Sequence, residues 1–176
     1  MSARPTQSWL SAALLAAIVL LSGAGASAAP LPEGAKMLRE EYGSWQVICA
    51  AKDEATRCVM QQVQIDAKTQ QRVLMIELGR GDNGNLSGIM VMPFGLDLQK
   101  GVGLGLEGGD PFQISGFSTC LPAGCIVPLT FGEKQLEVLR ENAALVISAT
   151  ANADAAPVKF AISLDGFVPA LNRLAD

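Results

Sequence analysis

The amino-acid sequence predicts a mainly β protein, an antiparallel β-sandwich or a partly closed barrel with two short helices in the C-terminal third. Short apolar segments separated by polar or glycine-rich turns follow one another from residue 44 to residue 130, which is the pattern of an all-β domain. Helical spacing of apolar residues begins only after Phe131. The gaps between the earlier segments are too short for crossover helices, so we do not expect a parallel α/β fold.

Residues 1–28 are predicted to be a signal peptide that is cleaved after Ala28. Arg4 supplies positive charge, residues 9–21 form an apolar run, and the sequence from Ala26 to Ala28 fits the small-x-small cleavage pattern. The apolar run is shorter than the roughly 20 residues that span a bilayer. We therefore expect an exported chain with no membrane span after the signal is removed.

Residues 29–43 contain proline, glycine and mixed charge without apolar periodicity, which predicts a flexible lead-in. A single domain over residues 44–176 is then expected, and its length is sufficient for a hydrophobic core. Apolar alternation and turn signals predict about nine strands in this domain. The strands are expected at residues 44–50, 58–66, 73–78, 86–92, 102–106, 111–119, 124–130, 145–150 and 158–164.

Two helices are expected near the end of the chain. Residues 133–142 place Leu136 and Leu139 three apart among charged residues, which suits a short amphipathic helix. Residues 165–174 show helical spacing of apolar side chains, with Asp165 as the expected N-cap. The carboxylates Glu133, Glu137 and Glu141 recur every four residues on the first helix. We interpret them as a solvated face, since catalytic carboxylate pairs lie across a cleft on different elements.

The composition excludes several classes of function. The chain contains no histidine, which removes Ser-His-Asp and Cys-His nucleophiles and histidine-zinc sites. Its net charge is −4, and −5 once Arg4 leaves with the signal. An acidic domain without basic clusters is unsuited to nucleic acid or to anionic lipid. We predict a non-enzymatic protein without metal or cofactor.

All four cysteines lie in the exported part, where an even number predicts disulfides. Three connectivities exist for Cys49, Cys58, Cys120 and Cys125. We favour Cys49 with Cys58 and Cys120 with Cys125, because the members of each pair are close in sequence. A redox role for Cys120 and Cys125 is the alternative. Their C-x4-C spacing and strand-rich context differ from the C-x-x-C at a helix N-terminus that lowers a thiol pKa.

Two short motifs in the sequence have simpler structural explanations. Gly103 to Gly108 matches G-x-G-x-x-G, but a turn follows it rather than a helix, so we expect a strand whose bare face lets another segment pack closely. Arg80, Gly81 and Asp82 form an RGD triplet at an expected hairpin tip. This triplet is a weak candidate for cell adhesion, because any tight turn selects glycine and aspartate.

A series of landmarks runs through nearly the whole mature chain: Trp45-x3-Cys49, a polar loop to Cys58 with Gln61 after it, Pro93-Phe94-Gly95-Leu96, Lys100-Gly101-Val102, Thr119-Cys120 to Gly124-Cys125, and Ser163-Leu164-x-Gly166-Phe167 before Ala170-Leu171. In this order they resemble the invasion-associated locus B family of bacterial exported proteins. The Cys-x3-Gly-Cys loop and the final Leu-x-Gly-Phe helix are the most specific parts. Arg140 to Asn142 depart from the pattern, which has Lys and Gly before the next strand.

The resemblance implies an envelope or surface protein, in the periplasm or on the outer surface of an alphaproteobacterial cell. The family takes its name from members that support entry of intracellular pathogens into red blood cells, and similar proteins also occur in free-living bacteria. It implies no catalytic residues. Our leading hypothesis is a disulfide-stapled β domain that binds an envelope or host protein. A periplasmic thiol-disulfide protein and a host-cell adhesin are the other hypotheses.

Overall fold

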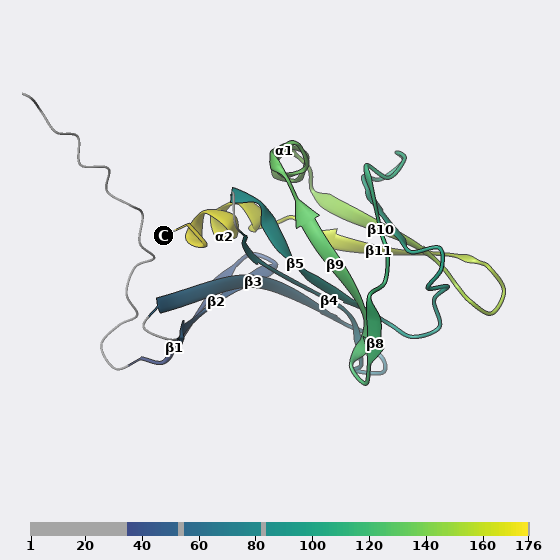
Figure 1. The fold of residues 1–176 in the computed structure, drawn as a ribbon, viewed down its shortest axis with the longest axis horizontal. Helices are drawn as coiled ribbons and strands as arrows, with labels where there is room; N and C mark the ends of the chain where they lie inside the picture. The colour runs from purple at the N-terminus through teal and green to yellow at the C-terminus, as the bar shows by residue number, and fades with distance from the viewer. Residues whose placement is uncertain (1–34, 53–54, 82–83, 176) are drawn as a thin grey trace, which may run out of the picture.

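The computed structural model describes residues 35–52, 55–81 and 84–175, and within them eleven strands and two helices form two antiparallel sheets (Figure 1). The larger sheet has the spatial order β1 (Met37–Tyr42), β2 (Trp45–Lys52), β3 (Ala55–Ile65), β4 (Arg72–Arg80), β5 (Leu86–Met92), β9 (Gly124–Phe131) and β8 (Thr119–Leu121). The smaller sheet has the order β11 (Pro157–Ser163), β10 (Ala144–Thr150), β6 (Val102–Gly105) and β7 (Gln113–Ser115). The sheets are not closed into a barrel, and the predicted mainly β class is confirmed.

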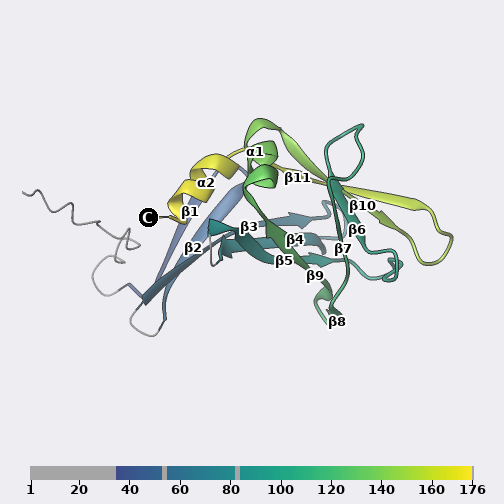
Figure 2. The same ribbon diagram turned by 45° about the horizontal axis from the view of Figure 1, so that its top comes forward.

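The chain passes repeatedly between the two sheets. It builds β1 to β5 as a meander, crosses to the smaller sheet for β6 and β7, and returns for β8 and β9. Helix α1 (Glu133–Glu141) then leads back to β10 and β11, and helix α2 (Phe167–Arg173) ends the described chain. Figure 2 shows β6, β7, β10 and β11 together at one end of the molecule.

One hydrophobic core joins both sheets and both helices. On β2, Trp45, Val47 and Cys49 point inward and are at most 2% exposed, as expected for strands with a period of two. The same core contains Ile147 of β10 and Ile162 of β11, which are fully buried. Burial of a large apolar side chain contributes roughly 1.5–3 kcal/mol, so the shared core holds the two sheets together.

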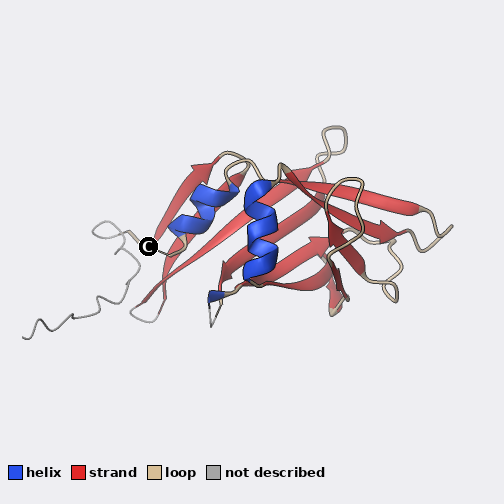
Figure 3. Ribbon diagram, turned by 90° about the horizontal axis from the view of Figure 1, so that it is seen from above, coloured by secondary structure: helices blue, strands red, loops and turns tan. Residues whose placement is uncertain are grey.

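Both helices lie across one face of the larger sheet, as Figure 3 shows from above. Helix α1 buries Leu136 and Leu139, as its sequence predicts. The N-cap of α2 is Gly166 and not the predicted Asp165. Gly166 has a φ of 79°, and a Cβ on it would lie 1.9 Å from the carbonyl oxygen of Tyr42. Glycine is therefore required where the chain enters α2 beside β1.

Two predicted segments differ from the structure. The flexible lead-in predicted for residues 29–43 is wrong for residues 37–42, which form edge strand β1; residues 29–34 lie outside the described part. The alternation of β1 escapes detection because one inward position is Glu40, whose charge is paired with Arg173. The single strand predicted for residues 111–119 is two strands, because the chain crosses between the sheets after Ser115.

The glycines of the G-x-G-x-x-G motif belong to a sheet. Gly103 and Gly105 lie on β6, and no helix follows them. A Cβ on Gly103 would come within 2.7 Å of a side-chain carbon of Pro111. The predicted close packing on the bare face of this strand is confirmed, and the packing segment is the loop that contains Pro111.

Candidate functional site

All four cysteines form disulfides, with Cys49 joined to Cys58 and Cys120 joined to Cys125. Each bond links two residues that lie directly opposite each other on neighbouring antiparallel strands. Both closed loops are short, with sequence separations of 9 and 5. By the loop-entropy estimate, loops of this kind contribute roughly 2–3 kcal/mol each. The bonds therefore stabilise local hairpins and do not join distant parts of the chain.

The Cys120–Cys125 pair lies in a β-hairpin. Cys120 is exposed and Cys125 is 2% exposed. No helix begins at either residue, so the dipole that activates a thioredoxin-type thiol is missing from this pair. The turn depends on Gly124, whose φ is 133° and where a Cβ would approach the carbonyl oxygen of Met92 to 2.5 Å.

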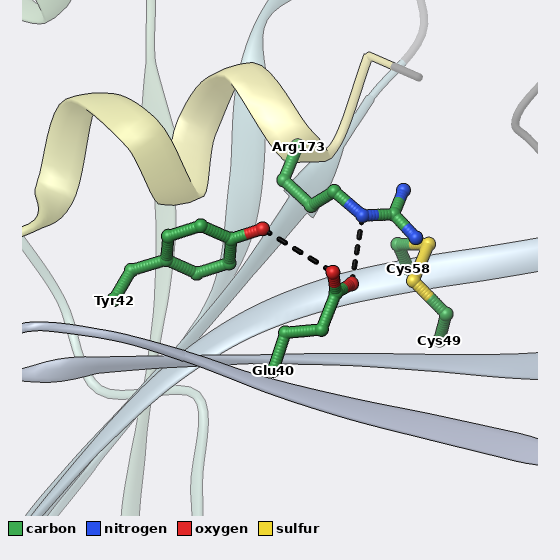
Figure 4. Close-up of a disulfide and its surroundings, with 5 residues drawn as sticks. All are labelled: Glu40, Tyr42, Cys49, Cys58 and Arg173. Atoms are coloured by element: carbon green, nitrogen blue, oxygen red, sulfur yellow. Dashed lines mark hydrogen bonds and ion pairs between the residues drawn. A yellow bond between two sulfur atoms is a disulfide. The ribbon is translucent and has the colours of Figure 1, made fainter.

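A polar cluster lies beside the Cys49–Cys58 disulfide and was not predicted from the sequence (Figure 4). The Nε of Arg173 donates to Oε2 of Glu40 at 2.7 Å, and the hydroxyl of Tyr42 donates to Oε1 of the same carboxylate at 3.4 Å. The ion pair is partly buried, with side-chain exposures of 15% for Arg173 and 31% for Glu40. It ties edge strand β1 to the last helix, which is a structural role.

A second polar contact joins the two sheets. Gln62 of β3 is 7% exposed and faces the edge of β11. Its Nε2 donates to the carbonyl oxygen of Ser163 at 2.9 Å, and its Oε1 accepts from the amide of Ser163 at 3.2 Å. The side chain of Gln62 thus makes the two hydrogen bonds with Ser163 that a neighbouring strand would otherwise make. Covering the backbone groups of an edge strand in this way protects the sheet edge. The signal in the sequence is the run of glutamines in the second half of β3.

The structure describes only part of the predicted adhesion triplet. Arg80 is the last residue of β4 and Gly81 follows it, whereas Asp82 lies outside the described residues. The guanidinium of Arg80 reaches the carbonyl oxygen of Gly84 at 3.5 Å. Arg80 also borders a hollow of about 190 Å³ with Arg57 and Leu174. Adhesion through the triplet stays a prediction.

In a chain without histidine, carboxylates are candidate catalytic groups. An open hollow of about 270 Å³ lies where β1, β2 and β3 meet, and Glu41 is the one carboxylate in its lining. Glycosidase chemistry requires two carboxylates across a cleft. Glu133, Glu137 and Glu141 are exposed on α1, which confirms the solvated face. Within the described ranges, no group of three or more histidine, cysteine, aspartate or glutamate side chains is placed to hold a metal ion.

The pKa of Asp66 is lowered in the turn between β3 and β4. The causes are the backbone amide and then the hydroxyl of Thr69, followed by the amide of Lys68, which all donate to the carboxylate. Hydrogen bonds to the charged form favour ionisation. Because the carboxylate is committed to the turn, its perturbation has a structural cause.

Two of the sequence landmarks, Pro93 to Leu96 and Thr119 to Cys125, are neighbours where β5 ends beside β9. Met92 lies opposite Cys125 in the register of β5 and β9, so Phe94 follows β5 beside the β8–β9 hairpin. The amide of Asp97 donates to the carbonyl oxygen of Thr150 at 2.8 Å, which fixes the next part of the segment against β10. Three large apolar side chains remain exposed on these segments: Phe94 (62%), Leu98 (45%) and Leu121 (52%). We call them the apolar end.

No helix in the described part of the chain has both the length and the hydropathy that would let it cross a membrane.

Comparison with known proteins gives a consistent set of relatives. The family described as Invasion associated locus B (IalB) protein matches residues 45–175. An invasion protein B homolog of Brucella abortus is 44% identical over 154 residues, which are 88% of each chain. Invasion protein B of Bartonella bacilliformis is 35% identical over 151 residues, covering 84% of this chain and 80% of the relative. The crystal structure of invasion associated protein B from Bartonella henselae matches with a TM-score of 0.73 at 32% identity, covering 78% of this chain and 94% of that one.

Proposed function

Because the chain belongs to the invasion-associated locus B family, we propose that it is an exported, non-enzymatic protein of the bacterial envelope that acts by binding a protein partner. The partner is an envelope protein or a host-cell protein. The relatives from Brucella and Bartonella carry the name invasion protein B, which supports a role in contact with host cells.

The observation that carries this proposal is the apolar end. Phe94, Leu98 and Leu121 stay exposed, whereas the core buries most other large apolar side chains of the described residues. Leu96 of the same segment is 7% exposed, so the segment is anchored while its neighbours face solvent. Large apolar side chains exposed together mark sites of interaction with other proteins.

A binding role agrees with the chemistry of the chain. The sequence contains no histidine, and the hollow at β1 to β3 offers a single carboxylate. The cysteines are all committed to disulfides. These features leave neither a free thiol among the described residues nor a histidine to act as a base.

Export is proposed on two grounds. Residues 1–28 have the pattern of a cleaved signal, although they lie outside the described structure. Two disulfides in a chain of this size are typical of an oxidising compartment. Protease treatment of intact cells, followed by treatment after the outer membrane is opened, distinguishes surface display from a periplasmic location.

Site-specific photo-crosslinking tests the binding role. A photoreactive phenylalanine analogue is placed at Phe94 or Leu121 in the exporting bacterium, which is then illuminated alone and in contact with host cells. We expect a discrete adduct with a second protein from both positions. Glu137 on the exposed face of α1 is the matched control and should give none. Absence of an adduct at both apolar positions under both conditions would contradict partner binding through this end.

A further inference from the structure

Strand β1 forms an open edge of the larger sheet. Within the described residues its one neighbouring strand is β2. Figure 2 shows β1 at the opposite end of the molecule from the smaller sheet. An edge strand presents a row of backbone N–H and C=O groups that can pair with another chain. The sequence of β1 decides which chain can do so.

The register of the β1–β2 hairpin fixes which backbone groups face the open edge. The amide of Ala51 donates to the carbonyl oxygen of Lys36 at 3.2 Å, so these two residues form a hydrogen-bonded pair. Hydrogen-bonded pairs alternate with non-bonded pairs along an antiparallel ladder. The backbone of Glu40 therefore bonds to β2, whereas the N–H and C=O groups of Arg39 and Glu41 point to the open edge.

The side chains beside these open groups carry opposite charges. Arg39 and Glu41 are exposed on the outer face of the larger sheet, which is the face away from the helices. Neither makes an ion pair with another described residue. Glu40 lies between them on the inner face, where its carboxylate is paired with Arg173 at 2.7 Å. The outer charges of β1 thus form a pattern that is complementary to itself when two copies run antiparallel.

We propose that β1 pairs with β1 of a second copy in an antiparallel dimer whose two-fold axis passes at Glu40. In this register Arg39 of each copy lies opposite Glu41 of the other, and each such pair exchanges both of its open backbone hydrogen bonds. Opposite charges directly across an antiparallel pair are stabilising. The two-fold symmetry supplies the contact twice. This interface is separate from the apolar end and does not depend on the function proposed above.

Charge disfavours the neighbouring registers that the open groups would allow. With the axis at residue 39, Arg39 would lie opposite its own copy, and with the axis at residue 41, Glu41 would do the same. Like charges directly opposite each other are destabilising. The charges of β1 therefore select one closed dimer, while they protect the edge from other strand pairings.

The inner face of the contact is compatible with the same register. Leu38 of each copy lies opposite Tyr42 of the other, and within one copy both side chains are only partly buried against the core. The two Glu40 side chains meet at the axis, and each is already paired with Arg173 of its own copy. The contact therefore joins apolar side chains and leaves no carboxylate without a cation.

The interface is small, because one pair of short strands forms it. Interfaces below about 1,200 Å² belong to weak or transient complexes. We therefore expect a dimer at high protein concentration and a monomer in dilute solution. A second copy is favoured over an unrelated strand because it carries the complementary charges at the required spacing.

Sedimentation equilibrium of the exported protein over a wide concentration series tests the proposal. The wild type should change from monomer to dimer as its concentration rises. Arg39→Glu and Glu41→Arg each bring like charges together, and each should raise the dissociation constant about tenfold or more. An equimolar mixture of these two variants should recover the dimer, and so should the double variant, because opposite charges again lie across the axis.

Glu137→Arg is the matched control, because it makes the same change of charge on the exposed face of α1 and should leave the dimer unchanged. Hydrogen exchange locates the contact. The amides of Arg39 and Glu41 should exchange more slowly as the concentration rises, whereas the amide of Glu40 is already bonded to β2 and should change less.

A wild type that stays monomeric at every concentration would overturn the proposal. So would a dimer that both single variants retain, or a mixture of the two variants that fails to dimerise. A dimer without slower exchange at Arg39 and Glu41 would place the contact elsewhere and would also overturn it. The photo-crosslinking at Phe94 and Leu121 is read separately, so that either proposal can fail alone.

Discussion

Gln62 shows how one polar side chain can connect two sheets. The side-chain amide of Gln62 donates to the carbonyl oxygen of Ser163 and accepts from its backbone N–H. The Nε1 of Trp45 donates to the same carbonyl oxygen at 2.9 Å. The carbonyl oxygen of Ser163 therefore keeps one donor, Trp45, if Gln62 is replaced. The backbone N–H of Ser163 depends on the side chain of Gln62 for its acceptor. A buried backbone N–H that has no acceptor destabilises the fold, because the cost of removing it from water is not compensated by a hydrogen bond.

We predict that Gln62→Leu lowers the free energy of unfolding by about 1–3 kcal/mol, because the amide of Ser163 loses its acceptor. Gln61→Leu is the control, since Gln61 pairs with Gln46 on the outer face at 3.0 Å and surface changes are usually within about 0.5 kcal/mol. Urea denaturation of both variants provides the measurement. Equal stability of the two variants would contradict the assigned role of Gln62.

The β3–β4 turn is stabilised by the ionised carboxylate of Asp66. Its Oδ1 accepts from the amides of Lys68 and Thr69 at 3.0 and 2.7 Å and from the Thr69 hydroxyl at 3.0 Å. These donors lower the pKa of Asp66 below its ordinary value of 3.8. A carboxylate with a lowered folded pKa stabilises the folded state above its unfolded pKa, and that contribution is lost as the pH falls through the folded pKa.

We predict that the carboxyl carbon of Asp66 titrates below pH 3.8 in an NMR experiment. Stability should fall with pH in this acidic range, and Asp66→Asn should reduce the dependence because asparagine stays uncharged while keeping an acceptor oxygen. A titration midpoint at or above 3.8 would show that the turn does not favour the charged form.

At the scale of the whole molecule, the two ends of the described chain are joined by one ion pair. Glu40 lies on the first strand and Arg173 at the end of the last helix, 133 residues apart. The Nη1 of Arg173 is buried and has no hydrogen-bond partner among the described residues. Glu40 is therefore the carboxylate that compensates this guanidinium, and its loss leaves a partly buried charge unpaired.

We predict that Glu40→Gln destabilises the fold by about 1.5–3 kcal/mol, the usual range for a hydrogen bond to a charged group. Hydrogen exchange of residues 37–42 should also become faster, because β1 is an edge strand. Glu41→Gln is the control, since Glu41 is exposed on the next position of the strand. Unchanged exchange in Glu40→Gln would mean that backbone pairing with β2 alone holds β1 in place.

The order of apolar and polar residues was sufficient to predict most of the architecture. Strands with regular alternation, such as β2 and β6, were found because a period of two is visible in sequence. The helix with Leu136 and Leu139 and the bare face of Gly103 were found for the same local reason. The landmarks around Cys49, Cys120 and Gly166 were sufficient to indicate the family.

The remaining features arise from contacts between residues far apart in the chain. Strand β1 was missed because its inward Glu40 looks exposed until Arg173 pairs with it. The inward position of Gln62 has meaning only when Ser163 lies opposite. The apolar end likewise appears only after folding, because a leucine or phenylalanine in a sequence looks the same whether the core buries it or not. Local periodicity thus predicts the elements, and tertiary packing decides which side chains remain available for a partner.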